Sequence, residues 1–463
     1  MPLLFQNARI VTATEDYAAD LLVIGEHIAA IAPRLVAAEC PPGTRVIDAT
    51  GKLLFPGFID PHVHVYLPFM GTFAKDDWTS ASRAALVGGT TTLIEMICPG
   101  KGEEPAAAYA IWKGHAAGKA ACDYAFHMGV TRWDALADRQ LREIVADGTA
   151  SFKVFLAYKG ALGVDDRELY HALKLARELG VVVTAHCENE TLVAERQAEL
   201  IAQGHTGPEW HEPSRPPTVE ASGVEHLMRF AEVTGAEVYV VHTSCADALD
   251  AARAGRARGV NVHVESVIPH FVLDRSYAER SGFEGAKYIM SPPLREKPHS
   301  NALWQALREG FISTVGTDHA PFDFEAQKAM GRNDFTKIPN GIPSVEHRVQ
   351  LLYTHGVAAG RIDLHRFVDA ASTRAARIFG LTGKGSIAIG GDADLCLWDP
   401  AHRGVISAAT HQMASDYSAF EGWPVQGRAE VVTVRGTVMA EAGRFVGPFG
   451  HGRFLKRSPK LPG

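Results

Sequence analysis

Histidine side chains lie at the ends of several apolar segments of this chain. The segment Phe58–His64 ends in a His-x-His pair, His62 and His64, and two later apolar segments end at His186 and His242. Since alternate residues of a strand point to the same side, His62 and His64 can project together. Imidazole nitrogens gathered in this way are typical ligands of zinc and related divalent ions. The spacing therefore predicts a metal centre.

A carboxylate ends a further apolar segment. Asp318 follows Thr314–Thr317, and His319 comes directly after it. Four histidines and one aspartate at such positions are hard to explain by packing, because a buried polar group without a partner costs about 1–3 kcal/mol. We expect Asp318 to be a metal ligand. His319, the next residue, should point to the opposite side of the strand, so we expect it to support the ligands rather than to bind metal. Glu265, at the end of another segment, is expected to hydrogen-bond behind the ligands.

A lysine interrupts one of the apolar segments. Lys153 lies within Ser151–Leu156, and lysine is rarely buried in a strand without a partner. Two divalent ions held side by side need a bridging anion. A lysine amine that has captured carbon dioxide becomes a carbamate, which can bridge two ions as a carboxylate does. Among four histidines and one aspartate, a carboxylated Lys153 is a candidate for this bridge.

The elements that must position these side chains alternate along the middle of the chain. Short β-branched runs are each followed by an Ala/Leu-rich stretch that is typical of a helix. Eight such runs end near His64, Met96, Val130, Leu156, His186, Thr243, Glu265 and Asp318. Eight strand–helix units predict an α/β fold of the (β/α)₈ TIM-barrel type, whose chemistry lies at the C-terminal ends of the strands. An open doubly wound sheet would carry a GxGxxG turn after its first strand, and no early strand is followed by one.

Both ends of the chain are rich in short strands. In the first part these are Leu3–Ile10, Leu21–Ile24, His27–Ala30 and Arg45–Asp48. In the last part they are Leu395–Trp398, Val431–Val434, Thr437–Ala440 and Arg444–Val446. The pattern predicts a smaller β-sandwich domain formed by both termini. We expect residues 1–55 to form its N-terminal part, 56–374 the catalytic barrel, and 375–463 its C-terminal part with the tail.

Composition and charge narrow the classes of partner. The 463 residues are 46% hydrophobic and 21% charged, as in ordinary globular enzymes. A net charge of −7 without any block of like charge argues against nucleic acid and membrane partners. The first residues lack the pattern of a signal peptide, and no apolar stretch approaches the ~20 residues of a membrane span. The six scattered cysteines form no CxxC pair, which favours reduced thiols and a cytoplasmic location.

The ligand pattern, taken in order along the chain, resembles the amidohydrolase superfamily. Within it, the chain is similar to the cyclic amidohydrolases of the dihydropyrimidinase and hydantoinase group. The phrase Gly385–Leu395 is similar to the return of that family into its β-sandwich. Four further segments carry the likeness, namely Pro68–Thr72 with Asp76-Asp77, Phe152–Lys159, Tyr288–Arg295 and Asp334–Gly341. The resemblance covers essentially the whole chain.

The resemblance implies two divalent metal ions per subunit, expected to be zinc, and a homotetramer. The positions that match metal ligands are His62, His64, Lys153, His186, His242 and Asp318. The His-x-His pair with Asp318 would hold the more buried ion, and the two single histidines would hold the other. Lys153, carboxylated on its side-chain nitrogen, would bridge both.

The resemblance also implies a set of substrate contacts. Tyr158, Ser291 and Asn340 match substrate-contacting positions, the last two largely through backbone groups. Phe69 and Met70 lie on a loop that gates the ring substituent in this family. The substrate would be a small cyclic ureide or imide, bound among mostly apolar side chains.

The implied reaction is hydrolysis of a ring amide, which opens dihydropyrimidines or hydantoins to N-carbamoyl amino acids. A hydroxide that bridges the two metal ions would be the nucleophile. Asp318 would act as general acid and base, taking the proton of the hydroxide and returning it to the leaving nitrogen. Tyr158 would donate a hydrogen bond to the developing oxyanion.

Three other functions are compared with this one, and allantoinase and a non-catalytic scaffold stay as the alternatives. Gly316–Phe322 is similar to allantoinase, which makes that activity an alternative. A dihydroorotase would need a cation after His64 to grip a carboxylated substrate, and Val65–Pro68 offers none. A non-catalytic, dihydropyrimidinase-like scaffold protein would have lost metal ligands, whereas all six positions are kept here. The sequence does not distinguish the preferred ring, the enantiomer or the native metal.

Overall fold

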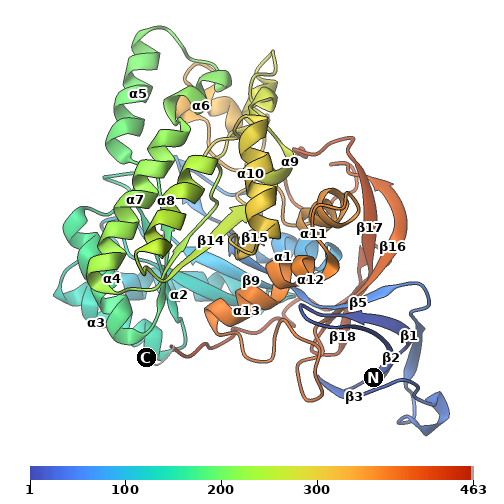
Figure 1. Ribbon diagram of the computed structural model, residues 1–463. Helices are drawn as coiled ribbons and strands as arrows, with labels where there is room; N and C mark the ends of the chain where they lie inside the picture. Colours follow the sequence, from blue (N-terminus) through green and yellow to red (C-terminus); the bar gives the residue numbers. More distant parts are fainter. Residues whose placement is uncertain (460–463) are drawn as a thin grey trace.

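The computed structural model describes residues 1–459, and a parallel barrel of eight strands forms its centre (Figure 1). The strands follow one another in chain order around the sheet. They are β6 (Phe58–Val63), β9 (Thr90–Ile97), β10 (Asp123–Gly129), β11 (Ser151–Phe155), β12 (Val182–His186), β13 (Val238–Val240), β14 (Val262–Val267) and β15 (Thr314–Gly316). Each of the eight predicted runs contains one of these strands, in the predicted order. The predicted TIM-barrel fold class is confirmed.

The barrel closes between its first and last strands, at the residues singled out for chemistry. The backbone N–H of Asp318 donates to the carbonyl of His62 at 3.0 Å, and that of His64 donates to the carbonyl of His319 at 2.8 Å. These two main-chain hydrogen bonds continue the sheet from β15 to β6. The predicted ligands of two distant segments therefore become neighbours as the barrel closes.

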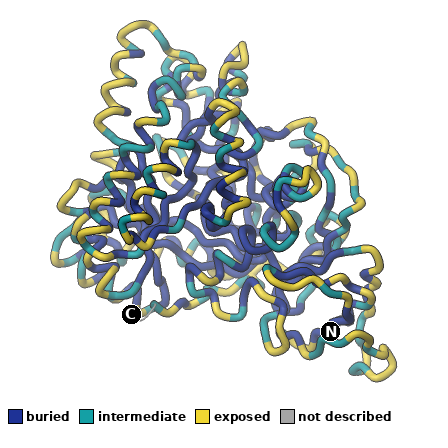
Figure 2. Tube along the Cα trace, in the orientation of Figure 1, coloured by how far each residue is buried: buried dark blue, intermediate teal, exposed yellow. Residues whose placement is uncertain are grey.

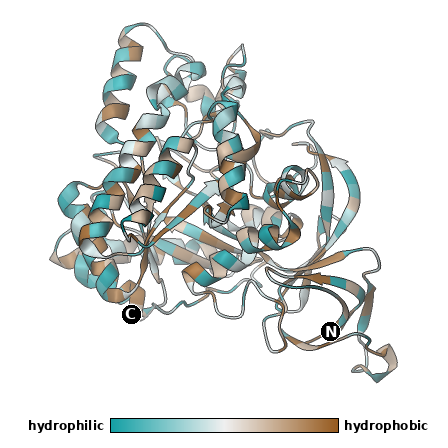
Figure 3. Cartoon of the chain, viewed as in Figure 1, coloured by the Kyte–Doolittle hydropathy of each residue, from teal (hydrophilic) through white to brown (hydrophobic). Residues whose placement is uncertain are grey.

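Helices cover the outside of the barrel, with one face turned to the strands (Figure 3). In α4 (Asp166–Leu179), Asp165 caps the N-terminus together with Glu168, and Gly180 ends the helix with φ of 67°. Its buried residues include Leu169 and Leu173, which are four positions apart and so lie on one face. Figure 2 shows the result: the barrel strands are buried, whereas exposed residues lie on the outer helix faces, in loops and on strands near both ends of the chain.

The remaining helices vary in length. They are α1 (Trp78–Val87), α2 (Pro105–Ala116), α3 (Ala135–Ala146), α5 (Glu190–Ala202), α6 (His211–Ser214), α7 (Pro217–Thr234), α8 (Ala246–Ala257), α9 (Ile268–Val272), α10 (Lys297–Arg308), α11 (Arg348–Leu352), α12 (Leu364–Val368) and α13 (Arg374–Phe379). Short helical turns that matter below are η5 (Lys328–Gly331) and η6 (Phe335–Lys337). Across residues 1–459, no helix is both long and apolar enough to cross a membrane.

Strands from both termini form a second, nine-stranded sheet beside the barrel (Figure 1). They are β1 (Leu3–Val11), β2 (Asp16–Ile24), β3 (His27–Ala32), β4 (Arg45–Asp48), β5 (Leu53–Pro56), β16 (Leu395–Val405), β17 (Pro424–Val434), β18 (Thr437–Glu441) and β19 (Arg444–Phe445). The two halves meet where β5 pairs with β1 on one side and β16 on the other. The strand β5 was not predicted, because all four of its residues are buried and show no alternation. The division of the chain after residues 55 and 374 stays a prediction. Helix α13 runs across the second of these boundaries.

A buried ionic cluster joins the terminal sheet to the barrel. The Nζ of Lys384 lies 2.6 Å from Asp123, which begins β10, and 2.8 Å from Asp394, which precedes β16. The guanidinium of Arg435 pairs with the same Asp123. Burial alone would lower the pKa of Lys384, but the charges of Asp394 and Asp123 outweigh it and raise that pKa. The aspartates of the Gly-Asp-Ala-Asp phrase thus have a structural task, since Asp392 also lies 3.0 Å from Lys384.

The chain end returns beneath the barrel, away from the C-terminal ends of the strands (Figure 1). Phe454 pairs with Tyr124 near the start of β10. The fully buried Arg457 donates to the carbonyl of Phe126 and, at 3.0 Å, to the hydroxyl of Ser151 at the start of β11. The tail therefore closes the N-terminal end of the barrel.

We predict that Lys384→Met destabilises the fold by about 3–5 kcal/mol, because it leaves two buried carboxylates without their shared cation. Denaturant unfolding of the purified variant measures this cost. Lys113→Met is the matched control, since Lys113 pairs with Asp147 on the surface at 2.6 Å and such pairs contribute at most about 1 kcal/mol. Equal stability of the two variants would contradict the structural role of the cluster.

Candidate metal centre and substrate cavity

Three predicted ligands converge at the C-terminal ends of β6 and β15. The Nε2 atoms of His62 and His64 lie 3.0 Å and 3.1 Å from Oδ1 of Asp318. The two Nε2 atoms are 3.3 Å apart. Ligand atoms around a tetrahedral zinc ion, with bonds of about 2.1 Å, would be separated by about 3.4 Å. The spacing of this group, which forms a candidate cation site, fits one small divalent ion.

A second pair of imidazoles lies beside the first group. The Nδ1 of His186 is 2.9 Å from Nε2 of His242, and the rings of His62 and His242 are 5.4 Å apart between centroids. Lys153 lines the same small cavity as His64, His186, His242 and Asp318. All six predicted ligands are thus brought together, although they come from five different strand ends.

Buried carboxylates orient the imidazoles from behind. The Nδ1 of His62 lies 3.0 Å from Oε1 of Glu265, which confirms the expected position of that residue. The Nε2 of His186 lies 2.7 Å from Glu188, which also accepts a hydrogen bond from Arg215 at 2.6 Å. A carboxylate behind a histidine fixes which nitrogen carries hydrogen, so the other nitrogen presents its lone pair to the centre.

His319 faces away from the cluster, as predicted. Its Nε2 lies 2.9 Å from Oδ2 of Asp76, and its Nδ1 accepts a hydrogen bond from the backbone of Ser344 at 3.1 Å. The neighbouring Asp77 caps α1, where its carboxylate accepts from Thr79 and Ser80. The Asp76-Asp77 pair therefore holds the loop after β6 in place.

Three of the four histidines at the site are uncharged, whereas the fourth, His62, favours its protonated form. Burial lowers the pKa of His64 to about 4 and also lowers the pKa values of His186 and His242, so these rings are neutral. His62 differs, because the charges of Glu265 and Asp318 outweigh the effect of burial and raise its pKa to about 9. The same attraction would be satisfied by a metal cation held between these groups.

Lys153 is the least satisfied side chain of the site. It is fully buried, and its Nζ has no hydrogen-bond partner among residues 1–459. The ring of Phe155 lies beside it, with its centroid 4.8 Å from Nζ. Burial lowers the pKa of the amine, which favours the uncharged form that reacts with carbon dioxide. A bare amine is a poor occupant of this position, whereas a carbamate would have two cations to bind.

Three residues of the site have a strained backbone conformation. Tyr158, His242 and Asp318 have φ values of 63°, 38° and 52°, in the left-handed region that favours glycine. Each such residue costs of order 1–3 kcal/mol. These backbone conformations direct the three side chains into the cavity, so the strain accompanies their orientation.

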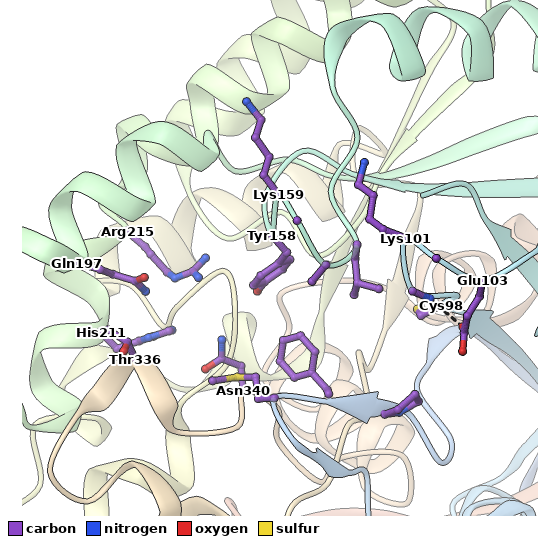
Figure 4. Close-up of a pocket in the computed structure, with 18 of the residues that line it drawn as sticks. Cys98, Lys101, Glu103, Tyr158, Lys159, Gln197, His211, Arg215, Thr336 and Asn340 are labelled. Atoms are coloured by element: carbon purple, nitrogen blue, oxygen red, sulfur yellow. Dashed lines mark hydrogen bonds between the residues drawn. The ribbon is translucent and has the colours of Figure 1, made fainter. Parts of the chain in front are cut away.

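A cavity of about 700 Å³ opens above the metal ligands, and Figure 4 shows its walls. An inner cavity of about 40 Å³, lined by five of the six predicted ligands, lies beside it. Both are lined by Phe69, Cys98, Tyr158, Leu162 and Asn340, so the two cavities adjoin one another. The inner part has room for ions and water, and a ring must enter through the outer part.

The predicted substrate contacts surround this space. The side-chain N–H of Asn340 donates to the hydroxyl of Ser291 at 3.0 Å, and the Tyr158 hydroxyl hydrogen-bonds with both side chains. The ring of Phe69 meets that of Tyr158 edge-on at 5.6 Å, and Met70 lines the outer cavity. Every residue predicted for the site therefore lies at the cluster or on the cavity wall.

Some cavity residues gave no signal in the sequence. Arg215 and His211 lie on one side of Tyr158, with Cys98 on the other (Figure 4). Arg215 stands between prolines in a stretch with no strand pattern, and Glu188 could equally belong to a loop after β12. A sequence motif connects residues that are near one another in the chain. Arg215 and Glu188 are 27 residues apart, so their ion pair forms only when the chain folds.

Comparison with known proteins adds an independent line of evidence. The Amidohydrolase family matches residues 53–439. A D-hydantoinase of Geobacillus stearothermophilus is 45% identical over 99% of this chain and 97% of its own length, and a dihydropyrimidinase of Rattus norvegicus is 37% identical over 99% and 89%. The solved structure of a D-hydantoinase (dihydropyrimidinase) from Thermus sp. superposes with a TM-score of 0.97 at 58% identity, covering 99% of each chain. With the barrel, the ligand cluster and these full-length likenesses in agreement, the chain belongs to the amidohydrolase family.

Proposed function

We propose that this chain hydrolyses the ring amide of neutral cyclic ureides, opening dihydropyrimidines or 5-substituted hydantoins to N-carbamoyl amino acids. The observation that carries the proposal is the convergence of six ligand-type side chains beneath a cavity that admits a small ring. Relatives named D-hydantoinase and dihydropyrimidinase support the same reaction class. Their names do not favour allantoinase or a non-catalytic scaffold.

The ligand set suits two divalent ions, which we propose to be zinc. His62, His64 and Asp318 would hold one, His186 and His242 the other, and a carboxylated Lys153 would bridge them. When bound, such ions lower the pKa of a shared water molecule and polarise the scissile carbonyl. A homotetramer and a cytoplasmic location stay predictions from the resemblance.

Main-chain groups are available to orient the ring. Within residues 1–459, the N–H and carbonyl of Ser291 and of Asn340 have no hydrogen-bond partner. We propose that they pair with the N–H and carbonyl groups of the substrate ring. Tyr158 would donate a hydrogen bond from its hydroxyl to the oxygen of the reacting carbonyl as negative charge develops there. Burial raises the pKa of Tyr158, which keeps this donor protonated.

Asp318 is proposed to move the proton. Its carboxylate takes a proton from the attacking water as the new carbon–oxygen bond forms, and delivers that proton to the ring nitrogen as the carbon–nitrogen bond breaks. Water is thus consumed, and the products are a neutral carbamoyl amine and a carboxylic acid, which releases its remaining proton to solvent and leaves as a carboxylate. Its place beside both His62 and His64 puts the carboxylate next to the water site.

Substrate choice tests the proposed function directly. We predict that dihydrouracil or a 5-substituted hydantoin exceeds dihydroorotate in kcat/KM by at least about 10²-fold, since a buried anion without a partner can cost that much. The buried cation of the cavity, Arg215, is already paired with Glu188. A hydrolysis screen that includes allantoin measures the ratios, and equal or better turnover of dihydroorotate would reject the assignment. Phe69→Ala and Met70→Ala should change tolerance of bulky substituents more than turnover of the unsubstituted ring.

Loss of the proposed bridge should empty the site. We expect close to two divalent ions per chain in the intact protein by elemental analysis, and removal of most metal and activity in Lys153→Ala. Short carboxylic acids should restore part of both, because they can occupy the vacated space. Lys113→Met, a surface lysine variant, should keep its metal. Normal metal content and turnover in Lys153→Ala would disprove the bridge.

Proton transfer is tested by Asp318→Asn, which keeps the shape and one oxygen but accepts no proton. We expect most metal to be retained while kcat falls by roughly 10²–10⁴. Metal analysis and steady-state kinetics on the same sample separate the two effects. Turnover close to that of the unchanged protein would assign the proton transfer to another group.

A further inference from the structure

A buried lysine lies behind the substrate cavity with no carboxylate beside it. The side chain of Lys328 is fully buried at the start of η5. Its Nζ donates to the carbonyls of Ile289, at 3.1 Å, and Pro339, at 2.9 Å. Burial lowers the pKa of this amine to about 7. Two carbonyl acceptors match the two hydrogens of a neutral amine, so both hydrogen bonds survive loss of the charge.

The two carbonyls belong to the segments that carry Ser291 and Asn340. Pro339 directly precedes Asn340, and Ile289 lies two residues before Ser291. The backbone N–H of Gly341 also donates to the Ile289 carbonyl, at 2.9 Å. A single amine therefore ties together two segments that are about fifty residues apart in the chain.

Other buried side chains hold the same segment. The Nε2 of His211 donates to the carbonyl of Met290 at 2.8 Å, and the Nε2 of His270 donates to that of Pro292 at 3.1 Å. The carbonyls on either side of Ser291 are thus occupied, while its own has no partner within residues 1–459. The segment is held so that the peptide groups of Ser291 are left free.

Gln327, the residue before Lys328, is hydrogen-bonded to a third loop of the cavity. The side-chain N–H groups of Gln327 donate to the hydroxyl of Thr72 and the carbonyl of Phe73, each at 2.7 Å. These acceptors lie in β8 (Thr72–Phe73), which forms a hairpin with β7 (Pro68–Phe69). The side-chain oxygen of Gln327 accepts from the backbone of Asp323 at 2.7 Å, so its amide is fully used.

We propose that Gln327 and Lys328 are positioning residues, a bracket that sets the spacing of the three loops facing the substrate. Lys328 fixes the separation of the Ser291 and Asn340 peptide groups, which set how the ring is held. Gln327 fixes the hairpin with Phe69 and Met70, which meets the ring substituent. The catalytic part of this inference rests on the proposed function, whereas the structural part does not.

Kinetics on the full-length, metal-loaded protein test the catalytic part. Lys328→Met should lower kcat/KM for dihydrouracil and for a 5-substituted hydantoin alike, by roughly 10- to 100-fold, mostly through KM, with unchanged metal content. Lys328→Gln, which keeps a donor, should lose less. Gln327→Ala should leave dihydrouracil within about twofold but change the ratio between the two substrates by at least about threefold.

Matched controls separate positioning from general destabilisation. Lys384→Met removes another buried lysine, far from the cavity, and should lower stability without raising KM. Gln305→Ala removes a surface amide, which donates a hydrogen bond to Glu309 at 2.8 Å, and should change neither the substrate ratio nor KM. An unchanged KM in Lys328→Met, or an unchanged substrate ratio in Gln327→Ala, would refute the bracket.

Hydrogen exchange tests the bracket even if no cyclic ureide is turned over. Gln327→Ala should speed exchange in residues 67–74 and at the backbone N–H of Asp323, which loses its acceptor. Lys328→Met should speed exchange in residues 288–292 and 338–342. If Lys328→Met does not fold, Lys328→Gln and Gln327→Ala still decide the matter. Exchange unchanged in these segments would overturn the bracket, whereas wild-type protein with two metals and no activity on any ring would overturn only the proposed function.

Discussion

Closure of the barrel between β6 and β15 is the constraint on which the site depends. The main-chain hydrogen bonds from Asp318 to His62 and from His64 to His319 complete the barrel and, by the same geometry, bring an imidazole pair to a carboxylate. Gly316 leaves room for Glu265 beside the junction of β6 and β15, because a Cβ at position 316 would lie 2.8 Å from Oε1 of Glu265. The carboxylate that orients His62 therefore fits only because β15 carries no side chain at that point.

The cost of the site is met by the rest of the fold. Three strained residues, a lysine without a hydrogen-bond partner and several buried imidazoles each oppose folding by about 1–3 kcal/mol. They are held by a barrel whose strands are almost wholly buried, by the ionic cluster around Lys384 and by the tail that places Arg457 beneath the barrel. Bound cations would return part of this cost, because they satisfy the nitrogens and carboxylates that converge without them.

The sequence predicted most reliably what periodicity and strand position determine. The barrel strands follow from the apolar runs, and the ligand-bearing strand ends follow from those runs that finish in histidine or aspartate. The alternation near both termini predicted a shared sheet. It did not predict β5, whose four residues are buried on both faces. Nor did it predict Glu188 with Arg215, or the contacts of Lys328, because these residues meet across loops that have no repeating pattern. Resemblance to a family supplied Tyr158, Ser291 and Asn340, which no pattern in this chain would have selected.

This division has a physical origin that bears on how such a site changes. The metal ligands lie at strand ends, where the hydrogen bonds of the sheet fix the direction in which each side chain leaves the backbone. The groups proposed to meet the ring lie on three loops, which have no ladder of hydrogen bonds of their own and depend on side chains such as Gln327 and Lys328. Substitutions in these loops can alter which ring fits while leaving the ligand geometry unchanged. The same barrel can then keep one hydrolytic chemistry while its loops vary the substrate.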